Sequence, residues 1–420
     1  MGPSRSTAAV GLAVLLMGAG LPAAAGEGPA RAQGHDRAPG HGRERAMAAQ
    51  EPVRFMTYNA SLNRAAPGRL QQDLATPDDA QARAVAELVQ RTAPDVLLLN
   101  EFDHDAAGRS AELFRTNYLE VPQRGQEPVH YPYVYTAPVN TGEPSGLDLN
   151  RDGVVGGPDD AWGFGLFPGQ YGMVLYSKHP LDTDGIRTFR DFRWADMPGS
   201  RLPAGHYAPG HAEQLRLSSK SHWDVPVRIG GTTVHVLASH PTPPTFDGPE
   251  DRNGRRNADE IRFWADYVRG PAASSYVYDD EGGRGGLRPG ERFVVMGDQN
   301  ADPLDGDSWP GAIQQLLAHP RVQDPLPASA GGPDAAARQG GANLAHRSDP
   351  AHDTADFTDD PAPGNLRADY VLPSRNLRVT GAGVFWPVPG APGAELTGEH
   401  PFPASDHRPV WVDVVPGARR

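Results

Sequence analysis

The chain has 420 residues, of which 38% are hydrophobic and 22% charged, so it can form a sizeable core and is not expected to be disordered throughout. Its 49 Gly and 43 Pro residues are too many for a helical bundle and indicate strands joined by long loops. The absence of Cys excludes disulfides, thiolate zinc sites, iron–sulfur clusters and cysteine nucleophiles. The net charge of −13 argues against a general nucleic-acid binder, because such proteins gain affinity by neutralising phosphates with basic residues.

The first segment of the chain has the layout of a targeting signal. Arg5 precedes a short apolar run, and the three Ala residues at 23–25 then resemble a signal-peptidase site. We therefore predict a secretory signal peptide over 1–25, a disordered leader over 26–50, and a secreted, extracellular protein. No later stretch is apolar enough to predict a stable membrane anchor.

Strands and helices are predicted in mixed order over residues 51–416. Short apolar or alternating runs predict strands at 53–58, 96–99, 173–176, 225–229, 233–238, 292–296, 370–372 and 409–414. Amphipathic stretches predict a helix of about 16 residues from Thr76, one at 255–267 and a shorter one at 312–318. Gly- and Pro-rich segments separate them at 120–170, 190–222, 268–290 and 325–365. The pattern predicts one α/β domain with long insertions, in which two packed sheets are flanked by helices.

Polar residues occur at the ends of these predicted strands. They are Asn59, Glu101, His240, Asp298, Asn300, Asp369, Asp406 and His407. Short buried strands that each bring one acid, amide or imidazole to the same edge build a convergent polar site. Carboxylates suit Mg²⁺, Mn²⁺ or Ca²⁺, and two imidazoles provide acid–base chemistry or donors to a developing negative charge. Together these groups are typical of phosphate ester hydrolysis.

The same residues carry a resemblance to a known family. In chain order the matching pieces are Thr57-Tyr58-Asn59, Leu99-Asn100-Glu101, Tyr171 to Ser177, Ser239-His240, Gly297 to Asn300, Arg367 to Tyr370 and Ser405-Asp406-His407. In this order the sequence resembles the endonuclease/exonuclease/phosphatase superfamily, which has the fold of pancreatic DNase I. The resemblance implies a four-layer sandwich of two mixed β-sheets flanked by helices, and hydrolysis that depends on a divalent metal.

The resemblance also implies roles for the oxygen-bearing residues. Glu101 would be the principal ligand of Mg²⁺ or Mn²⁺. Asn59 would bind the metal or a phosphate oxygen, and Asp406 would complete the metal shell. Asp298 would orient or deprotonate the attacking water, while Asn300 would hold a phosphate oxygen.

The remaining implied catalytic roles concern the ring-bearing residues. His240 would protonate or stabilise the leaving side. His407 would contact the scissile phosphate, and Asp369 would fix its tautomer and orientation. Tyr171 lies where some members use an aromatic hydroxyl. A Tyr before Gly at a strand start is also often a core residue.

A twelve-residue calcium-binding pattern occupies 148–159. Oxygen donors at positions 1, 3, 5 and 12, Gly153 at position 6 and a backbone carbonyl at position 7 fit this loop. The donors are Asp148, Asn150, Asp152, Val154 and Asp159. Asp159 replaces the usual Glu, and the surrounding Gly and Pro residues do not predict flanking helices. We predict a structural Ca²⁺ that orders this insertion; the alternative is a solvated acidic turn.

A second polar group lies at the entry to the predicted strand 225–229. Lys220 and His222 could bind a substrate phosphate there, since a cation and an imidazole both suit phosphate oxygens. The alternative is a solvated turn with Trp223 packed beneath it.

These observations predict a secreted metal-dependent phosphoesterase that attacks a phosphodiester or phosphomonoester with water. Nucleic acid, a lipid headgroup and a small organic phosphate all remain candidate substrates, and a monomer is expected. One alternative is an extracellular DNase I-like nuclease, which the negative charge disfavours. The other is a non-catalytic binding or toxin-like subunit, which would be expected to lack Glu101, Asp298 or His407, and all three are present.

Overall fold

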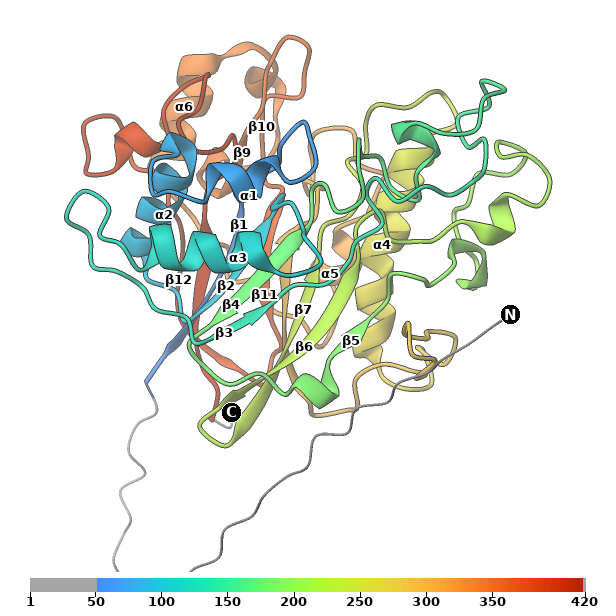
Figure 1. Ribbon diagram of the computed structural model, residues 1–420, viewed down its shortest axis with the longest axis horizontal. Coiled ribbons are helices and arrows are strands. Elements are labelled where there is room, and N and C mark those ends of the chain that lie inside the picture. The colour runs from blue at the N-terminus through green and yellow to red at the C-terminus, as the bar shows by residue number, and fades with distance from the viewer. Residues whose placement is uncertain (1–50, 418–420) are drawn as a thin grey trace, which may run out of the picture. The chain divides into compact units, whose positions relative to one another are not determined.

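The computed structural model describes residues 51–417, and two face-to-face β-sheets form its centre (Figure 1). The predicted signal peptide and leader lie outside the described residues. Within the described range, six strands form one sheet in the order β12-β13-β1-β2-β4-β3, and five form the other in the order β11-β8-β7-β6-β5. The first sheet consists of β1 (Val53–Asn59), β2 (Val96–Asn100), β3 (Tyr133–Tyr135), β4 (Met173–Ser177), β12 (Arg378–Val384) and β13 (Val410–Val415). The second consists of β5 (Arg187–Thr188), β6 (His222–Ile229), β7 (Thr232–Ser239), β8 (Arg292–Asp298) and β11 (Asp369–Pro373).

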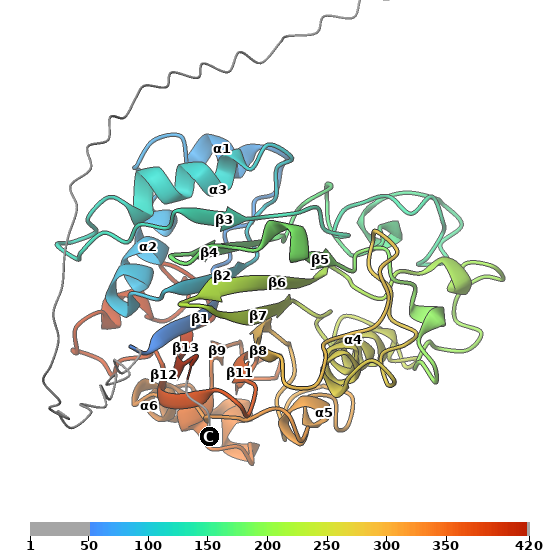
Figure 2. The same cartoon turned by 90° about the horizontal axis from the view of Figure 1, so that it is seen from below.

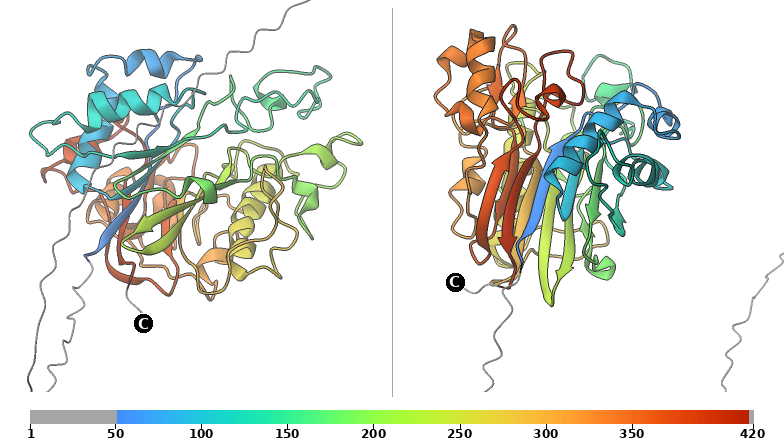
Figure 3. Two further views of the ribbon diagram at one scale, coloured as in Figure 1. Left: turned by 60° about the horizontal axis from the view of Figure 1, so that its bottom comes forward. Right: turned by 90° about the vertical axis from the view of Figure 1, so that its left-hand side faces the viewer.

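Helices cover the outer face of each sheet (Figure 2). The first sheet carries α1 (Arg69–Asp73), α2 (Ala80–Thr92) and α3 (Arg109–Phe114), and the second carries α4 (Arg252–Arg269) and α5 (Gln314–Leu317). Helix α6 (Gly331–Gln339) and the short ribbon of β9 (Ala355–Asp356) and β10 (Asn365–Leu366) belong to the long connection before β11. Seen edge-on, the strands lie between helices on both sides (Figure 3). The predicted four-layer α/β sandwich is therefore confirmed.

Strand β2 shows why the sequence forms these layers. All of its residues are buried, and successive side chains of a strand point to opposite faces. Leu97 and Leu99 pack in the cluster beneath α1–α3, whereas Val96 and Leu98 pack against the second sheet. A continuous apolar run is thus explained by a strand with protein on both sides.

The predicted elements agree with the structure except near their ends. Helix α2 starts at Ala80 rather than near Thr76, because the Asp79 carboxylate accepts a hydrogen bond from the N–H of Ala82 and caps it. Helix α4 is longer than predicted and α5 shorter. The sequence pattern missed several short elements, among them α1, α3, α6, β3 and β5, and also the longer strand β12. In β12, Gly383 takes the place of an apolar side chain because a Cβ there would lie 2.7 Å from the Trp411 ring. Among residues 51–417, no helix is long and apolar enough to span a membrane.

Candidate active site

One edge of the two sheets collects the polar strand ends. Strands β1 and β2 run parallel toward it, and their last residues, Asn59 and Asn100, are paired. In the other sheet β8 ends there at Asp298, which is paired with Asp369 at the start of antiparallel β11. Residues far apart in sequence therefore meet at one end of the sandwich.

The carboxylate of Asp298 lies at the centre of the site and is 1% exposed. Its Oδ2 accepts a hydrogen bond of 3.1 Å from Asn59 Nδ2. The same oxygen lies 3.4 Å from His240 Nε2 and 3.7 Å from His407 Nε2. Its Oδ1 accepts from the N–H of Asn300 at 2.9 Å. Four of the predicted site residues thus converge on a fifth.

Close packing of β7 against β8 positions Asp298. Gly297, directly before it, has φ of 139°, and a Cβ there would lie 1.9 Å from the backbone oxygen of Ser239. The N–H of Asp298 donates to Oδ1 of Asn100, which also accepts from the Thr57 hydroxyl, both at 3.3 Å. Asn100 belongs to a predicted motif, but its role in tying β2 to β8 was missed.

His407 is held by a second buried carboxylate. Its Nδ1 lies 2.8 Å from Oδ2 of Asp369, and the same oxygen accepts from Thr354 Oγ1 at 2.8 Å. Asp369 Oδ1 is buried and has no hydrogen-bond partner among the described residues. Burial alone would lower the pKa of His407, but Asp369 and Asp298 raise it well above the ordinary value. The ring is therefore held as a cation with Nε2 directed toward Asp298.

Glu101 immediately follows β2 in a left-handed conformation, with φ of 57°. Its Oε2 accepts a 2.9 Å hydrogen bond from Asn63 Nδ2. Burial raises the pKa of Glu101, while the Lys220 charge and a hydrogen bond from Asn59 oppose the shift. Glu101 lines the cavity, and a carboxylate in such a position is stabilised when a cation binds beside it.

The structure places Lys220 among the acids of the site but not its neighbour His222. Lys220 is 6% exposed, and burial lowers its pKa against the opposing charges of Glu260, Glu101 and Asp298. His222 packs in the second sheet, where its ring contacts the Ser218 hydroxyl and Nε2 lies 2.9 Å from the Glu260 carbonyl. Burial lowers its pKa to about 4. Neither ring nitrogen of His222 is free for a substrate.

The remaining predicted residues surround this centre. Burial, with the charges of Lys220 and His407, lowers the pKa of His240 well below its ordinary value, so the ring is neutral, and Nδ1 has no partner among the described residues. Asn300 Nδ2 donates to the Pro241 carbonyl at 3.1 Å, which fixes its amide. Asp406 lines the cavity beside His407.

Tyr171 lies on the Glu101 side of the site. Its phenol pKa is raised by burial and by the charges of Glu101 and Asp103. Its backbone φ is 55°, in the left-handed region also adopted by Glu101 and by Asn300, with φ of 50°. Strained backbone of this kind clusters at functional sites.

Asp103 is a site residue that the sequence interpretation missed. Its carboxylate accepts hydrogen bonds from the N–H groups of Arg64 at 2.8 Å and Tyr171 at 3.1 Å, and so joins two loops beside Glu101. Burial raises its pKa to about 7, against these hydrogen bonds. The position of Asp103 two residues after Glu101 was the sequence signal that could have identified it. Asn63, which donates to Glu101, had no such signal in the sequence.

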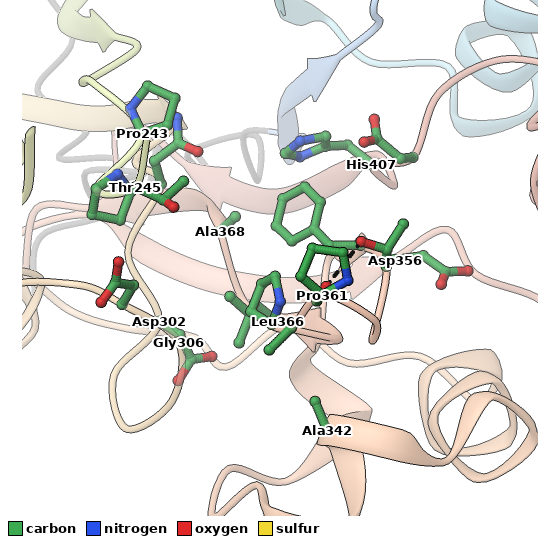
Figure 4. Close-up of a pocket in the computed structure, with 18 of the residues that line it drawn as sticks. Pro243, Thr245, Asp302, Gly306, Ala342, Asp356, Pro361, Leu366, Ala368 and His407 are labelled. Carbon is green, nitrogen blue, oxygen red and sulfur yellow. Dashed lines mark hydrogen bonds between the residues drawn. The ribbon is translucent and has the colours of Figure 1, made fainter. Parts of the chain in front are cut away.

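A cavity of about 1520 Å³ opens over these groups (Figure 4). Glu101, Asp298, Asp406 and His407 line it. Asp298, Asp369 and His407 also bring ligand-capable atoms within 4.8 Å of one another. The carboxylates of Glu101 and Asp406, which line the cavity, and the buried, unpartnered Asp369 Oδ1 are oxygen donors of the kind that a hard divalent cation prefers.

The calcium-pattern segment lies in the insertion before β4. Asp148 Oδ2 accepts from the N–H of Gly153 at 3.0 Å, and Asn150 and Asp152 accept from the backbone two residues on. Asp159 is exposed. The neighbouring Asp160 is buried and accepts from the N–H groups of Leu149, Asn150 and Gly156.

The fold is a two-sheet α/β sandwich, and the polar strand ends at one edge of its sheets offer oxygen donors for a divalent cation. The model of the Endonuclease/Exonuclease/phosphatase family matches residues 56–407, and the chain belongs to this family. Members of the family are generally metal-dependent hydrolases of phosphoesters.

Solved structures similar to this chain include proteins from three bacteria. An endonuclease/exonuclease/phosphatase from Beutenbergia cavernae is 19% identical, with a TM-score of 0.49 and coverage of 88% of this chain and 73% of its own. A family protein from Leptotrichia buccalis is 13% identical, with a TM-score of 0.45 and coverage of 86% and 99%. A beta toxin from Staphylococcus aureus is 14% identical, with a TM-score of 0.42 and coverage of 86% and 99%. Comparison with curated protein sequences returned no match.

Proposed function

We propose that the protein hydrolyses phosphodiester or phosphomonoester bonds by in-line attack of water, with Mg²⁺ or Mn²⁺ as its metal. The observation that carries this proposal is the convergence of Asn59, His240 and His407 on the Asp298 carboxylate, which lines the cavity together with His407. The three groups differ in proton affinity and so suit three different roles. The carboxylate can act as a base, the neutral imidazole can assist the leaving group, and the cationic imidazole can contact the phosphate.

Each residue has one task in this reaction. Asp298 orients the water and accepts its proton, because it is buried beside the cavity and its pKa is raised to about 7 by burial. His407, held as a cation by Asp369, binds a phosphate oxygen through Nε2. Neutral His240, whose Nε2 lies 3.4 Å from Asp298 Oδ2, stabilises the leaving oxygen. A divalent cation held by Asn59, Glu101 and Asp406 would neutralise charge on the phosphate oxygens.

An activity panel tests this function. Purified protein would be assayed on bis-p-nitrophenyl phosphate, p-nitrophenyl phosphate, plasmid DNA and sphingomyelin, with Mg²⁺, with Mn²⁺ and with EDTA. We expect EDTA and His407→Ala each to abolish turnover, while His235→Ala, which removes a histidine from another Asp–His pair, leaves most of it. Turnover that survives both EDTA and His407→Ala would refute the mechanism. Cleavage of DNA above all other substrates would favour a nuclease, and folded protein without any turnover would favour a non-catalytic binding subunit.

We also propose that the insertion binds a structural Ca²⁺ through the 148–159 loop. The spacing of its oxygen donors supports this, as does Asp148 Oδ1, which is buried without a partner. Calcium should raise the melting temperature of the protein but not of Asp148→Ala. Equal shifts in both proteins would remove the idea.

Secretion is a further proposal, supported by the layout of residues 1–25. Expression of the full chain in a bacterial host, followed by N-terminal sequencing of protein from the medium, tests it. A mature start close to residue 26 is expected, whereas retention of the intact chain in the cells would contradict it.

A further inference from the structure

The cavity that contains the catalytic groups has a second wall of different chemistry. Besides the carboxylates, the cavity is lined by apolar side chains from several separate segments of the chain. These are Pro243, Pro244, Phe246, Phe357, Pro361, Leu366 and Phe402. Because one continuous cavity holds both sets, a phosphoester bound at Asp298 and His407 would extend one of its substituents along this wall.

The apolar wall begins directly beside the catalytic imidazole. The Phe357 ring stands edge-on to the His407 ring, with centroids 5.3 Å apart and planes at 79°. Figure 4 shows Leu366 between the loop bearing Pro243 and Thr245 and the segment bearing Asp356 and Pro361. On the outer side, Phe246 is 84% exposed, which is unusual for a Phe without a partner surface.

The charges around the same cavity do not suit a polyanion. Arg338 is the one Arg or Lys among the described residues that line it, and its guanidinium is already paired with Asp334 and Glu399. Asp302 and Asp307 add negative charge to the wall. A nucleic acid or polyphosphate would place further phosphates here, where the described lining offers no unpaired Arg or Lys side chain to neutralise them.

We propose that the substrate is a phosphoester carrying one bulky apolar substituent, aryl or alkyl, that binds along this wall against Phe357, Leu366 and Phe246. This inference rests on the proposed phosphoesterase function. Removal of the substituent from water supplies binding energy, while the acids exclude substrates with several phosphates.

A pair of soluble esters tests the preference. Phenyl p-nitrophenyl phosphate should have a kcat/KM at least about tenfold above that of methyl p-nitrophenyl phosphate, since each factor of ten needs only about 1.4 kcal/mol. Phe357→Ala and Phe246→Ala should reduce this ratio toward one. Phe246 is 84% exposed, so its replacement leaves the core intact even if Phe357→Ala folds poorly. Leu344→Ala is the matched control, because Leu344 is 82% exposed and does not line the cavity.

Two further experiments identify the source of the apolar substituent and distinguish a failure of this inference from a failure of the proposed function. Vesicles of phosphatidylcholine and sphingomyelin show whether a lipid supplies the apolar group. Calorimetry with phenylphosphonate and methylphosphonate on Asp298→Asn protein with Mg²⁺ measures binding without turnover. If no ester is cleaved but phenylphosphonate binds more tightly and Phe246→Ala removes the difference, the proposed hydrolysis fails, while the preference of this cavity for a phosphoryl ligand with an apolar substituent stands. Equal kcat/KM for the two esters, equal binding of the two phosphonates, or plasmid DNA as the best substrate would overturn it.

Discussion

Two Asp–His pairs in this protein, each with a buried carboxylate, have almost the same geometry. His407 Nδ1 lies 2.8 Å from Asp369, and His235 Nδ1 lies 2.7 Å from Asp224. The first pair is at the polar strand edge, and the second is between β6 and β7 in the second sheet. Both histidines have a raised pKa: burial acts to lower it in each, and the neighbouring carboxylates outweigh this effect.

The pairs differ in what surrounds them. The second oxygen of Asp224 accepts a 2.7 Å hydrogen bond from the Tyr267 hydroxyl, which in turn accepts from Arg187 at 3.0 Å. Asp369 Oδ1 has no such partner among the described residues, and His407 faces a second carboxylate and the cavity. An Asp–His pair therefore indicates a functional site only where unfilled hydrogen-bonding capacity meets an open cavity.

The largest expected effect comes from the catalytic side of this comparison. Asp298→Asn should lower kcat by roughly 10³-fold or more, because the amide cannot accept a proton from water. Its melting temperature should stay close to that of the wild type or rise, since a buried charge is removed. Steady-state kinetics and calorimetry measure both. Retention of kcat in Asp298→Asn would show that another group is the base.

Asp369→Asn should have the next largest effect, with a loss of roughly 10²-fold in kcat. The amide would no longer hold His407 as a cation or fix which nitrogen carries the proton. Asp224→Asn is the matched variant in the other pair, and its kcat should stay within a few-fold of the wild type. Equal losses of kcat in the two variants would contradict the proposed difference between a catalytic and a structural Asp–His pair.

Asp224→Asn should instead affect stability. It weakens hydrogen bonds from His235 and Tyr267, and bonds to charged groups each contribute about 1.5–3 kcal/mol. We expect the free energy of unfolding in urea to fall by an amount in this range. An unchanged midpoint of unfolding would show that the pair contributes little to the fold.

The smallest expected effect is a pH dependence of stability from the same pair. The raised pKa of His235 means that the folded state binds its proton more tightly than the unfolded chain. This contribution is fully present below the unfolded value of about 6.5 and is lost as the pH rises through the folded value. The difference in unfolding free energy between wild type and His235→Gln should therefore be larger at pH 6 than at pH 9. The opposite order would contradict the assignment.

Strand ends were the predictable part of the site. The apolar run 96–99 had to end where Asn100 and Glu101 begin, and parallel strands bring such ends together. His222 was misplaced because β6 begins at His222 rather than at 225, so the residue belongs to the buried strand and not to a loop before it. The hydrogen bond from Asn63 to Glu101 and the Asp224–His235 pair depend on tertiary packing, which no spacing in the sequence encodes. The residues between 335 and 366 that line the cavity were likewise not predicted, because the sequence indicated only an irregular Gly- and Pro-rich segment there.

The link between Asn59 and Asp298 joins residues from opposite sheets of the sandwich. The proposed catalytic site therefore persists only as long as the two sheets keep their alignment. A small shift of one sheet against the other, which leaves every strand intact, would already break the hydrogen bond between Asn59 and Asp298. In a denaturant series, activity should consequently be lost at a lower denaturant concentration than the circular-dichroism signal. Turnover would then report on the alignment of the two sheets.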